Sequence, residues 1–137
     1  MKLSKTSEYA LRILTYMARD PEQTNTAKSL VGTLKISDKY LRRLMTDLTK
    51  AGFIYSIQGR DGGYAFARPI SSIHLSDIVD AVESMEKYTD CILGFDQCCH
   101  ENPCVMHSFW AGTREEFIRT FTTRTLDQLD FKEIFKF

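Results

Sequence analysis

Apolar residues recur at helical spacing in three successive segments of the first half of the chain. Within residues 4–18, 27–34 and 38–50, apolar side chains return every three or four positions. Ser37 stands before the third segment and has the short polar side chain typical of a helix N-cap. Gly52 follows that segment, as expected after the end of a helix. The pattern therefore predicts three helices joined by short connections.

Two short segments with strand character come next. Residues 53–57 and 64–67 are rich in aromatic and apolar residues, and residues 58–63 between them contain three glycines. Glycine tolerates the positive φ angles of a hairpin tip. Three helices followed by a hairpin predict a winged helix-turn-helix, mainly α with a small β-hairpin. In such a unit the third helix enters the major groove of DNA and the hairpin tip lies along the backbone or the minor groove.

The composition agrees with one globular domain. The chain has 137 residues, of which 43% are hydrophobic and 26% charged. It shows no apolar run of membrane-spanning length and no apolar signal segment, so we expect a cytoplasmic protein without a membrane partner. Its charges cancel overall, but residues 1–70 carry a net charge of +6 and residues 71–137 one of −6. The basic half contains the predicted helix-turn-helix, which favours double-stranded DNA as its partner over an interaction with another protein.

Candidate DNA contacts lie at the start of the third helix and at the tip of the hairpin. Side chains in the N-terminal half of a recognition helix reach base edges, and arginine suits a narrow minor groove. The expected contact residues are Ser37, Asp38, Lys39, Tyr40, Arg42, Arg43, Arg60 and Gly62.

The second half is expected to contain a short turn and an amphipathic helix, then an irregular loop, then a long helix. The chain accordingly divides into a DNA-binding unit with its closing helix (1–86), a cysteine loop (87–103) and a dimerisation helix with its tail (104–137). The long helix is predicted to run from about residue 104 to 125 and carries large aromatic residues at helical spacing. Such a helix needs a partner surface, and a twin helix of a second subunit would supply it.

All four cysteines lie within fourteen residues, at positions 91, 98, 99 and 104, and His107 follows Cys104 by three positions. Thiolates and an imidazole at this spacing suit an iron–sulfur cluster or a zinc ion. The spacing lacks the Cys-x-x-Cys pairs of zinc ribbons, and a loop this loose favours the larger cluster. A zinc-containing or thiol-redox repressor without a cluster is the alternative. The chain shows no phosphate-binding glycine loop and no catalytic Ser/His/Asp set, so we do not expect an enzyme.

Several longer motifs run through the chain. They are Met1-Lys-Leu-Ser-Lys-x-Ser-Glu-Tyr-Ala-Leu-Arg, Ser37-Asp-Lys-Tyr-Leu-Arg-Arg-Leu, Leu48-x-x-Ala-Gly, Ser56-x-x-Gly-x-x-Gly-Gly-Tyr-x-x-Ala-Arg-Pro, Leu75-x-Asp-Ile-Val-x-Ala-x-Glu and the three-cysteine loop. Together they resemble the Rrf-two family of bacterial transcription regulators, the IscR- and NsrR-like winged-helix proteins. The resemblance covers nearly the whole chain.

This resemblance implies a homodimer that is joined by the long C-terminal helix and reads a palindromic operator. It implies that Cys91, Cys98 and Cys104 hold a 2Fe–2S or 4Fe–4S cluster near the wing, and that changes to the cluster switch the affinity for DNA. His107 matches the histidine ligand of the iron–sulfur-biogenesis regulators. Glu8 matches the position from which some nitric-oxide sensors supply a carboxylate from the other subunit. Both residues are candidates for the fourth ligand.

The chain departs from the family pattern at two positions. Cys99 is an additional cysteine, which either replaces Cys98 as a ligand or acts as a resolving thiol. Gln58 stands where the family often has arginine before the wing glycine. Either Arg60 takes over insertion into the minor groove or the groove preference differs.

Overall fold

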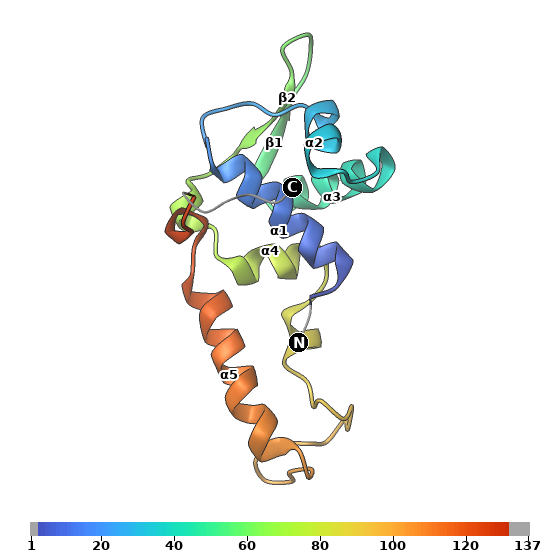
Figure 1. Ribbon diagram of the computed structural model, residues 1–137, viewed down its shortest axis with the longest axis vertical. Helices are drawn as coiled ribbons and strands as arrows, with labels where there is room; N and C mark the ends of the chain where they lie inside the picture. The colour runs from blue at the N-terminus through green and yellow to red at the C-terminus, as the bar shows by residue number, and fades with distance from the viewer. Residues whose placement is uncertain (1–2, 132–137) are drawn as a thin grey trace.

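The computed structural model describes residues 3–131 and shows a mainly helical protein with one small β-hairpin (Figure 1). Its elements are α1 (Lys5–Ala18), α2 (Ala27–Leu34), α3 (Asp38–Lys50), β1 (Ile54–Ile57), β2 (Gly63–Phe66), η1 (Ile70–Ser72), α4 (Leu75–Val82), η2 (Met85–Tyr88), α5 (His107–Thr123) and η3 (Leu126–Gln128), where η marks a short 3-10 turn. The expected fold class is therefore confirmed, and the first three helices lie where the hydrophobic pattern predicts them.

Short polar side chains begin each of these three helices. The hydroxyl oxygens of Ser4, Thr26 and Ser37 accept hydrogen bonds from backbone N–H groups in the first turns of α1, α2 and α3. Such caps satisfy donors that a helix start leaves unpaired. Lys35 ends α2 in the left-handed conformation with φ at 55°. This residue reverses the chain tightly and so sets α3 directly after α2.

The hairpin is an antiparallel pair in which Ile54 faces Phe66 and Ile57 faces Gly63. Its tip requires glycine for steric reasons. A Cβ atom on Gly62 would lie 2.2 Å from the carbonyl oxygen of Ile57. Gly63 has a φ of 151°, and a Cβ there would lie 2.6 Å from the carbonyl oxygen of Asn25. The glycine-rich segment thus allows the wing to fold back on itself and against the loop between α1 and α2.

The core lies between α1, α2, α3, α4 and the base of the hairpin. α1 packs against α4, and α3 contacts both α2 and α4. The largest fully buried side chains are Ile13, Leu14, Met17, Leu30, Leu41, Leu44, Met45, Leu48, Ile54, Ile73, Ile78 and Leu126. Leu126 comes from the C-terminal segment, and its N–H donates to the carbonyl of Ile73 over 3.0 Å. The chain therefore returns after α5 to close the core of the winged unit.

The amphipathic segment after the hairpin does not form one continuous helix up to the cysteine loop. α4 ends at Val82, because Glu83 takes a non-helical conformation with φ at −151° and ψ at −128°. A 3-10 turn, η2, follows and leads into the cysteine loop. The long helix is also shorter than expected and begins at His107 instead of residue 104. The N–H of Cys104 donates to the sulfur of Cys98, which holds this residue in the loop.

α5 projects away from the winged unit (Figure 1). Among its residues His107 is the buried one, while Phe109 is 74% exposed. Within residues 3–131, the helices are too short or too polar to traverse a lipid bilayer. The tail after α5 begins with the 3-10 turn η3, and residues 132–137 lie outside the described part of the chain.

The hairpin and the cysteine loop lie at opposite ends of the protomer (Figure 1). The wing forms the top of the view, whereas the loop between η2 and α5 forms the bottom. The expectation that the cysteines lie near the wing is therefore wrong within one protomer. The physical reason is that η2 and α5 both leave the winged unit on the side of α4 and carry the loop away from the hairpin.

Candidate functional site

The start of α3 presents a row of charged side chains to solvent. Lys39, Arg42 and Arg43 are all exposed. Asp38 and Arg42 form an ion pair of 3.0 Å one turn apart. Ser37 is used as the N-cap of the helix. This face therefore combines exposed cations with one arginine whose guanidinium is paired with a neighbouring carboxylate.

Tyr40 belongs to the same helix turn but faces inward. Its hydroxyl lies 2.5 Å from the hydroxyl of Thr6 on α1. Its ring packs edge to face on Tyr9, with ring centroids 5.6 Å apart. The structure thus brings Tyr40 to the interface of α3 with α1, whereas the other expected residues of α3 lie on its outer side.

A groove lies between the wing and the helices α2 and α3. Its volume is about 360 Å³, and its lining includes Thr26, Lys28, Arg42 and Gly62. Arg60 is exposed at the wing tip. Lys28 and Thr26 were missed by the sequence interpretation, although a basic residue in the first turn of α2, next to its cap, was a usable signal. The groove places cations of two helices, Lys28 and Arg42, on one concave surface beside the glycines of the wing.

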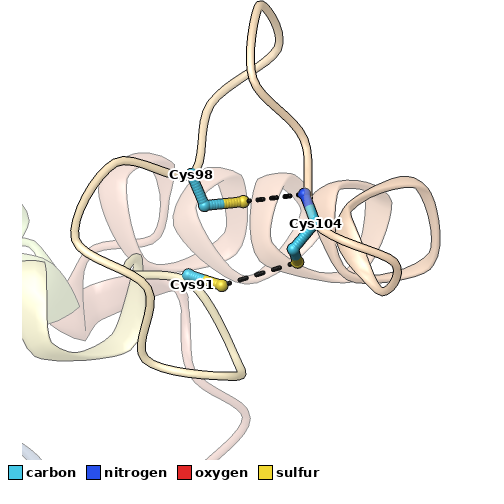
Figure 2. A group of neighbouring side chains, drawn as sticks. All are labelled: Cys91, Cys98 and Cys104. Carbon is cyan, nitrogen blue, oxygen red and sulfur yellow. Dashed lines mark hydrogen bonds between the residues drawn. The ribbon is translucent and has the colours of Figure 1, made fainter.

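Three of the four cysteines converge at the far end of the molecule (Figure 2). The Sγ atoms of Cys91, Cys98 and Cys104 all lie within 4.8 Å of one another. Those of Cys91 and Cys104 are 3.6 Å apart. The backbone N–H of Cys104 donates to Sγ of Cys98 over 3.4 Å. Cys99 is exposed and lies outside this group, with its backbone paired to Asn102.

Side chains of α5 hold the beginning of the loop. The indole N–H of Trp110 donates to the carbonyl of Asp90 over 2.8 Å. The guanidinium of Arg114 donates to the carbonyl of Thr89 over 3.1 Å. Cys91 follows directly, so these two bonds fix where its thiol stands relative to the helix that bears His107.

His107 adds an imidazole to the three thiols. Its Nδ1 lies 3.4 Å from Sγ of Cys98, and its Nε2 lies 3.2 Å from Nδ1 of His100. The side chain is only 7% exposed. Glu8, the other expected fourth ligand, lies on α1 and pairs with Lys5 at 3.1 Å. The sequence interpretation missed His100, although a histidine between the cysteines is a metal-binding residue type.

The environment changes the acidity of two of the thiols in opposite directions. Hydrogen bonds from the backbone N–H groups of Phe95 and Leu93 outweigh partial burial and lower the pKa of Cys91 from 9.0 to about 7. At Cys98 the N–H of Cys104 favours the thiolate, but burial and the neighbouring thiols raise its pKa. The loop therefore offers one thiol that ionises readily beside another that keeps its proton.

Two of the thiols, those of Cys98 and Cys104, line an open depression. Its volume is about 360 Å³, and its walls include Phe95, Cys98, Pro103 and Cys104. Soft thiolate donors with one imidazole suit iron in a cluster and also zinc. The residues present therefore fit an iron–sulfur cluster.

Known proteins share both the sequence pattern and the fold. The family described as "Rrf2: Iron-dependent Transcriptional regulator" matches residues 3–130. Protein rrf2 of Nitratidesulfovibrio vulgaris is 34% identical over 130 residues, which are 94% of this chain and 87% of that protein.

Two solved structures have a similar arrangement. CymR, described as the global cysteine regulator of B. subtilis, has a TM-score of 0.80 at 24% identity, over 98% of this chain and 99% of its own. IscR of T. potens has a TM-score of 0.70 at 26% identity, over 93% of this chain and 84% of its own. The similarity to CymR shows the fold alone, so it does not distinguish a cluster from a different cysteine chemistry.

Proposed function

The chain belongs to the Rrf2 family of transcriptional regulators, a family of regulators and not of enzymes, and from this premise we propose a dimeric regulator switched by an iron–sulfur cluster. Residues 1–86 bind a palindromic operator and residues 87–103 provide the sensor. Within residues 104–137 the long helix joins two subunits, while Leu126 after it packs into the core of the DNA-binding unit. The protein acts in the cytoplasm, where bacterial DNA is accessible. The convergence of three thiols, whose sulfur atoms lie within 4.8 Å of one another, carries this proposal.

The DNA-binding role is supported by the charge of the face between α3 and the wing. Lys39, Arg42 and Arg43 are exposed on α3, and Lys28 adds a cation on the other side of the groove. Cations at such positions neutralise phosphates, and a recognition helix in the major groove reads base edges. Arg60 at the wing tip contacts the backbone or the minor groove.

The sensing role rests on the cysteine loop. Cys91, Cys98 and Cys104 hold the cluster, which supplies a centre that oxygen, nitric oxide or loss of iron can alter. His107 is the favoured fourth ligand and belongs to the same protomer as the three cysteines. Its Nδ1 already faces Sγ of Cys98. Glu8 of the partner subunit is the second candidate. Cys99 stays outside the ligand set.

Dimer formation is supported by the exposed apolar surface of α5 and the residues before it. Val105 is 84% exposed and Phe109 74%. α5 has 17 residues and buries little more than His107 in its own protomer, so Phe109 and the two apolar residues just before the helix, Val105 and Met106, are left in water. A second copy of α5 covers this surface, and the two-fold axis of that dimer matches a palindromic operator.

A thiol switch without a cluster is the second candidate function. The distance of 3.6 Å between the sulfurs of Cys91 and Cys104 favours it, because a small movement of the loop brings the two thiols into bonding distance. An oxidant such as a peroxide would accept two electrons as the two thiols lose their protons and form a disulfide. This repressor would contain neither iron nor sulfide.

Metal and sulfide analysis of anaerobically purified protein separates the two candidates. The visible absorption spectrum is recorded, and iron, acid-labile sulfide and zinc are measured on the same sample. We expect iron with an equal amount of sulfide, and the iron content per subunit then distinguishes a two-iron from a four-iron cluster. Zinc alone, or no metal after reconstitution with iron and sulfide, would refute the cluster.

A further inference from the structure

A largely buried carboxylate connects the cysteine half of the chain to the DNA-binding half. Glu83 follows α4, and its Oε1 accepts hydrogen bonds from the hydroxyls of Ser4, Ser7 and Tyr88, the last over 2.7 Å. Its Oε2 accepts from Lys87 over 3.2 Å. Burial acts to raise the pKa of Glu83, but these donors outweigh it and lower the pKa from 4.5 to about 2. The side chain is therefore an anion that gathers hydroxyl groups from two separate segments.

Tyr88 is the link from Glu83 towards the cysteines. It ends η2, only three positions before Cys91, and it is 7% exposed. Its ring contacts Phe117 of α5, with ring centroids 5.8 Å apart. Trp110 of the same helix binds the carbonyl of Asp90, between Tyr88 and Cys91. A displacement of the loop relative to α5 therefore acts directly on the partner of Glu83.

The first turn of α1 is the link from Glu83 towards DNA. Ser7 is fully buried and donates to the carboxylate. On the same turn, Thr6 meets the hydroxyl of Tyr40 at 2.5 Å, and Tyr9 packs against its ring. Tyr40 lies in the first turns of α3, between Lys39 and the arginines of the DNA-binding face. The position of α1 thus constrains the start of the recognition helix.

We propose that Glu83 is the positioning residue through which the state of the cysteine loop sets the placement of α1 and α3 for operator binding. This inference rests on the proposed function, because it requires the cluster to change operator affinity. A carboxylate suits the role because it accepts hydrogen bonds and donates none, so three hydroxyls can converge on one oxygen. When the loop shifts Tyr88, the carboxylate and the start of α1 shift with it.

The substitution Glu83→Gln tests this role while preserving size. It removes the charge and places an amide N–H₂ where Oε2 accepts from Lys87. Glu86→Gln is the matched control, because Glu86 is an exposed carboxylate of the neighbouring turn η2. A duplex enriched from a random-sequence library with the wild-type protein serves as the selected duplex. Its affinity is measured anaerobically for each protein with the cluster loaded and after its removal by a chelator.

The measured quantity is the ratio of the two affinities. A substitution that only damages the fold lowers the active fraction of the cluster-loaded and the cluster-free protein alike, so it leaves this ratio unchanged. We expect a ratio within about 5–150-fold in the wild type and in Glu86→Gln, and a ratio below about twofold in Glu83→Gln. Equal iron content and unchanged Trp110 fluorescence in loaded Glu83→Gln show that the loop itself is intact.

The remaining outcomes overturn the inference in distinguishable ways. A wild-type ratio retained in Glu83→Gln, or reduced equally in Glu86→Gln, refutes the role of Glu83 and leaves the cluster switch standing. A wild-type ratio of one refutes the cluster switch and the role of Glu83 together. Should Glu83→Gln fail to fold, Ser7→Ala removes one buried donor to the same oxygen and is expected to reduce the ratio, whereas an unchanged ratio refutes the inference.

Discussion

The sulfur of Cys98 lies 3.4 Å from Nδ1 of His107, across nine positions of the chain. The opposite nitrogen of the ring, Nε2, lies 3.2 Å from Nδ1 of His100, and the two rings stand edge to face at 82°. The imidazole is therefore held between a thiol on one side and a second histidine on the other. A metal-binding nitrogen with a partner at its other nitrogen is the usual arrangement of a histidine ligand.

This relationship leads us to expect that His107→Ala destabilises the cluster and that Glu8→Gln does not. Loss of a residue that only supports a metal ligand typically weakens metal binding by about 10–100-fold. Removal of the ligand itself should weaken iron retention by at least as much. The rate at which visible absorbance decays in the presence of a chelator measures this retention. His74→Ala, at the start of α4, is the control. Rapid decay in Glu8→Gln with normal decay in His107→Ala would assign the ligand to the partner subunit.

The wing cation makes a separate prediction about salt dependence. Arg60→Ala should weaken binding to the selected duplex and reduce the slope of log affinity against log salt concentration by about one for each phosphate that the arginine neutralises. Fluorescence anisotropy titrations at several salt concentrations measure the slope. Lys87→Ala removes one cation beside Glu83 at a distance from the wing and should leave the slope unchanged. An unaltered slope in Arg60→Ala would exclude the wing tip from the phosphate-binding surface.

The exposed face of α5 predicts the oligomeric state. Phe109→Glu places a charge where a second copy of the helix is expected to bury an aromatic ring, at a cost on the order of 2 kcal/mol or more. Sedimentation velocity should show a dimer for the wild type and a monomer for this variant. Tyr55→Glu changes an exposed aromatic residue of the wing instead and should remain dimeric. A dimeric Phe109→Glu protein would move the interface elsewhere.

The acidity of Glu83 predicts a contribution to stability that depends on pH. Its pKa is about 2 in the folded protein against an ordinary value of 4.5, so the carboxylate stabilises the fold above pH 4.5. That contribution, at most about 3 kcal/mol, is lost as the pH falls from 4.5 towards 2. Urea unfolding at a series of pH values should show a steeper acid loss for the wild type than for Glu83→Gln. Parallel curves would show that the carboxylate is not held by its hydroxyl donors.

Local sequence signals predicted the elements that are fixed by local physics. Ser37 marks the start of α3 because a hydroxyl cap acts within one turn. The wing is predicted because glycine tolerates the backbone of a hairpin tip, and a Cβ atom on Gly62 would meet the carbonyl oxygen of Ile57 only five positions away. The clustering of three cysteines was likewise visible from their spacing. These features depend on contacts between residues that are close in sequence.

The features that the sequence left open depend on distant contacts. Glu83 closes a recognisable motif, yet its donors Ser4 and Ser7 lie at the other end of the DNA-binding unit. Tyr40 was expected among the DNA contacts, but its contacts with Thr6 and Tyr9 of α1 show that it faces inward. The cysteine loop lies far from the wing because the chain leaves the helical path after α4. No glycine or proline at this point of the sequence predicts that break. The structure of the segments between the DNA-binding face and the cysteine loop is therefore set by tertiary packing, which local sequence patterns do not reveal.

One anaerobic titration tests the central claim most directly. The affinity for the selected duplex is measured for the cluster-loaded wild type, for the same sample after removal of the cluster, and for Cys91→Ala. We expect the two wild-type states to differ by about 5–150-fold, corresponding to a coupling of about 1–3 kcal/mol, and Cys91→Ala to match the cluster-free state under all conditions. A single affinity shared by all three samples would contradict a cluster-controlled regulator.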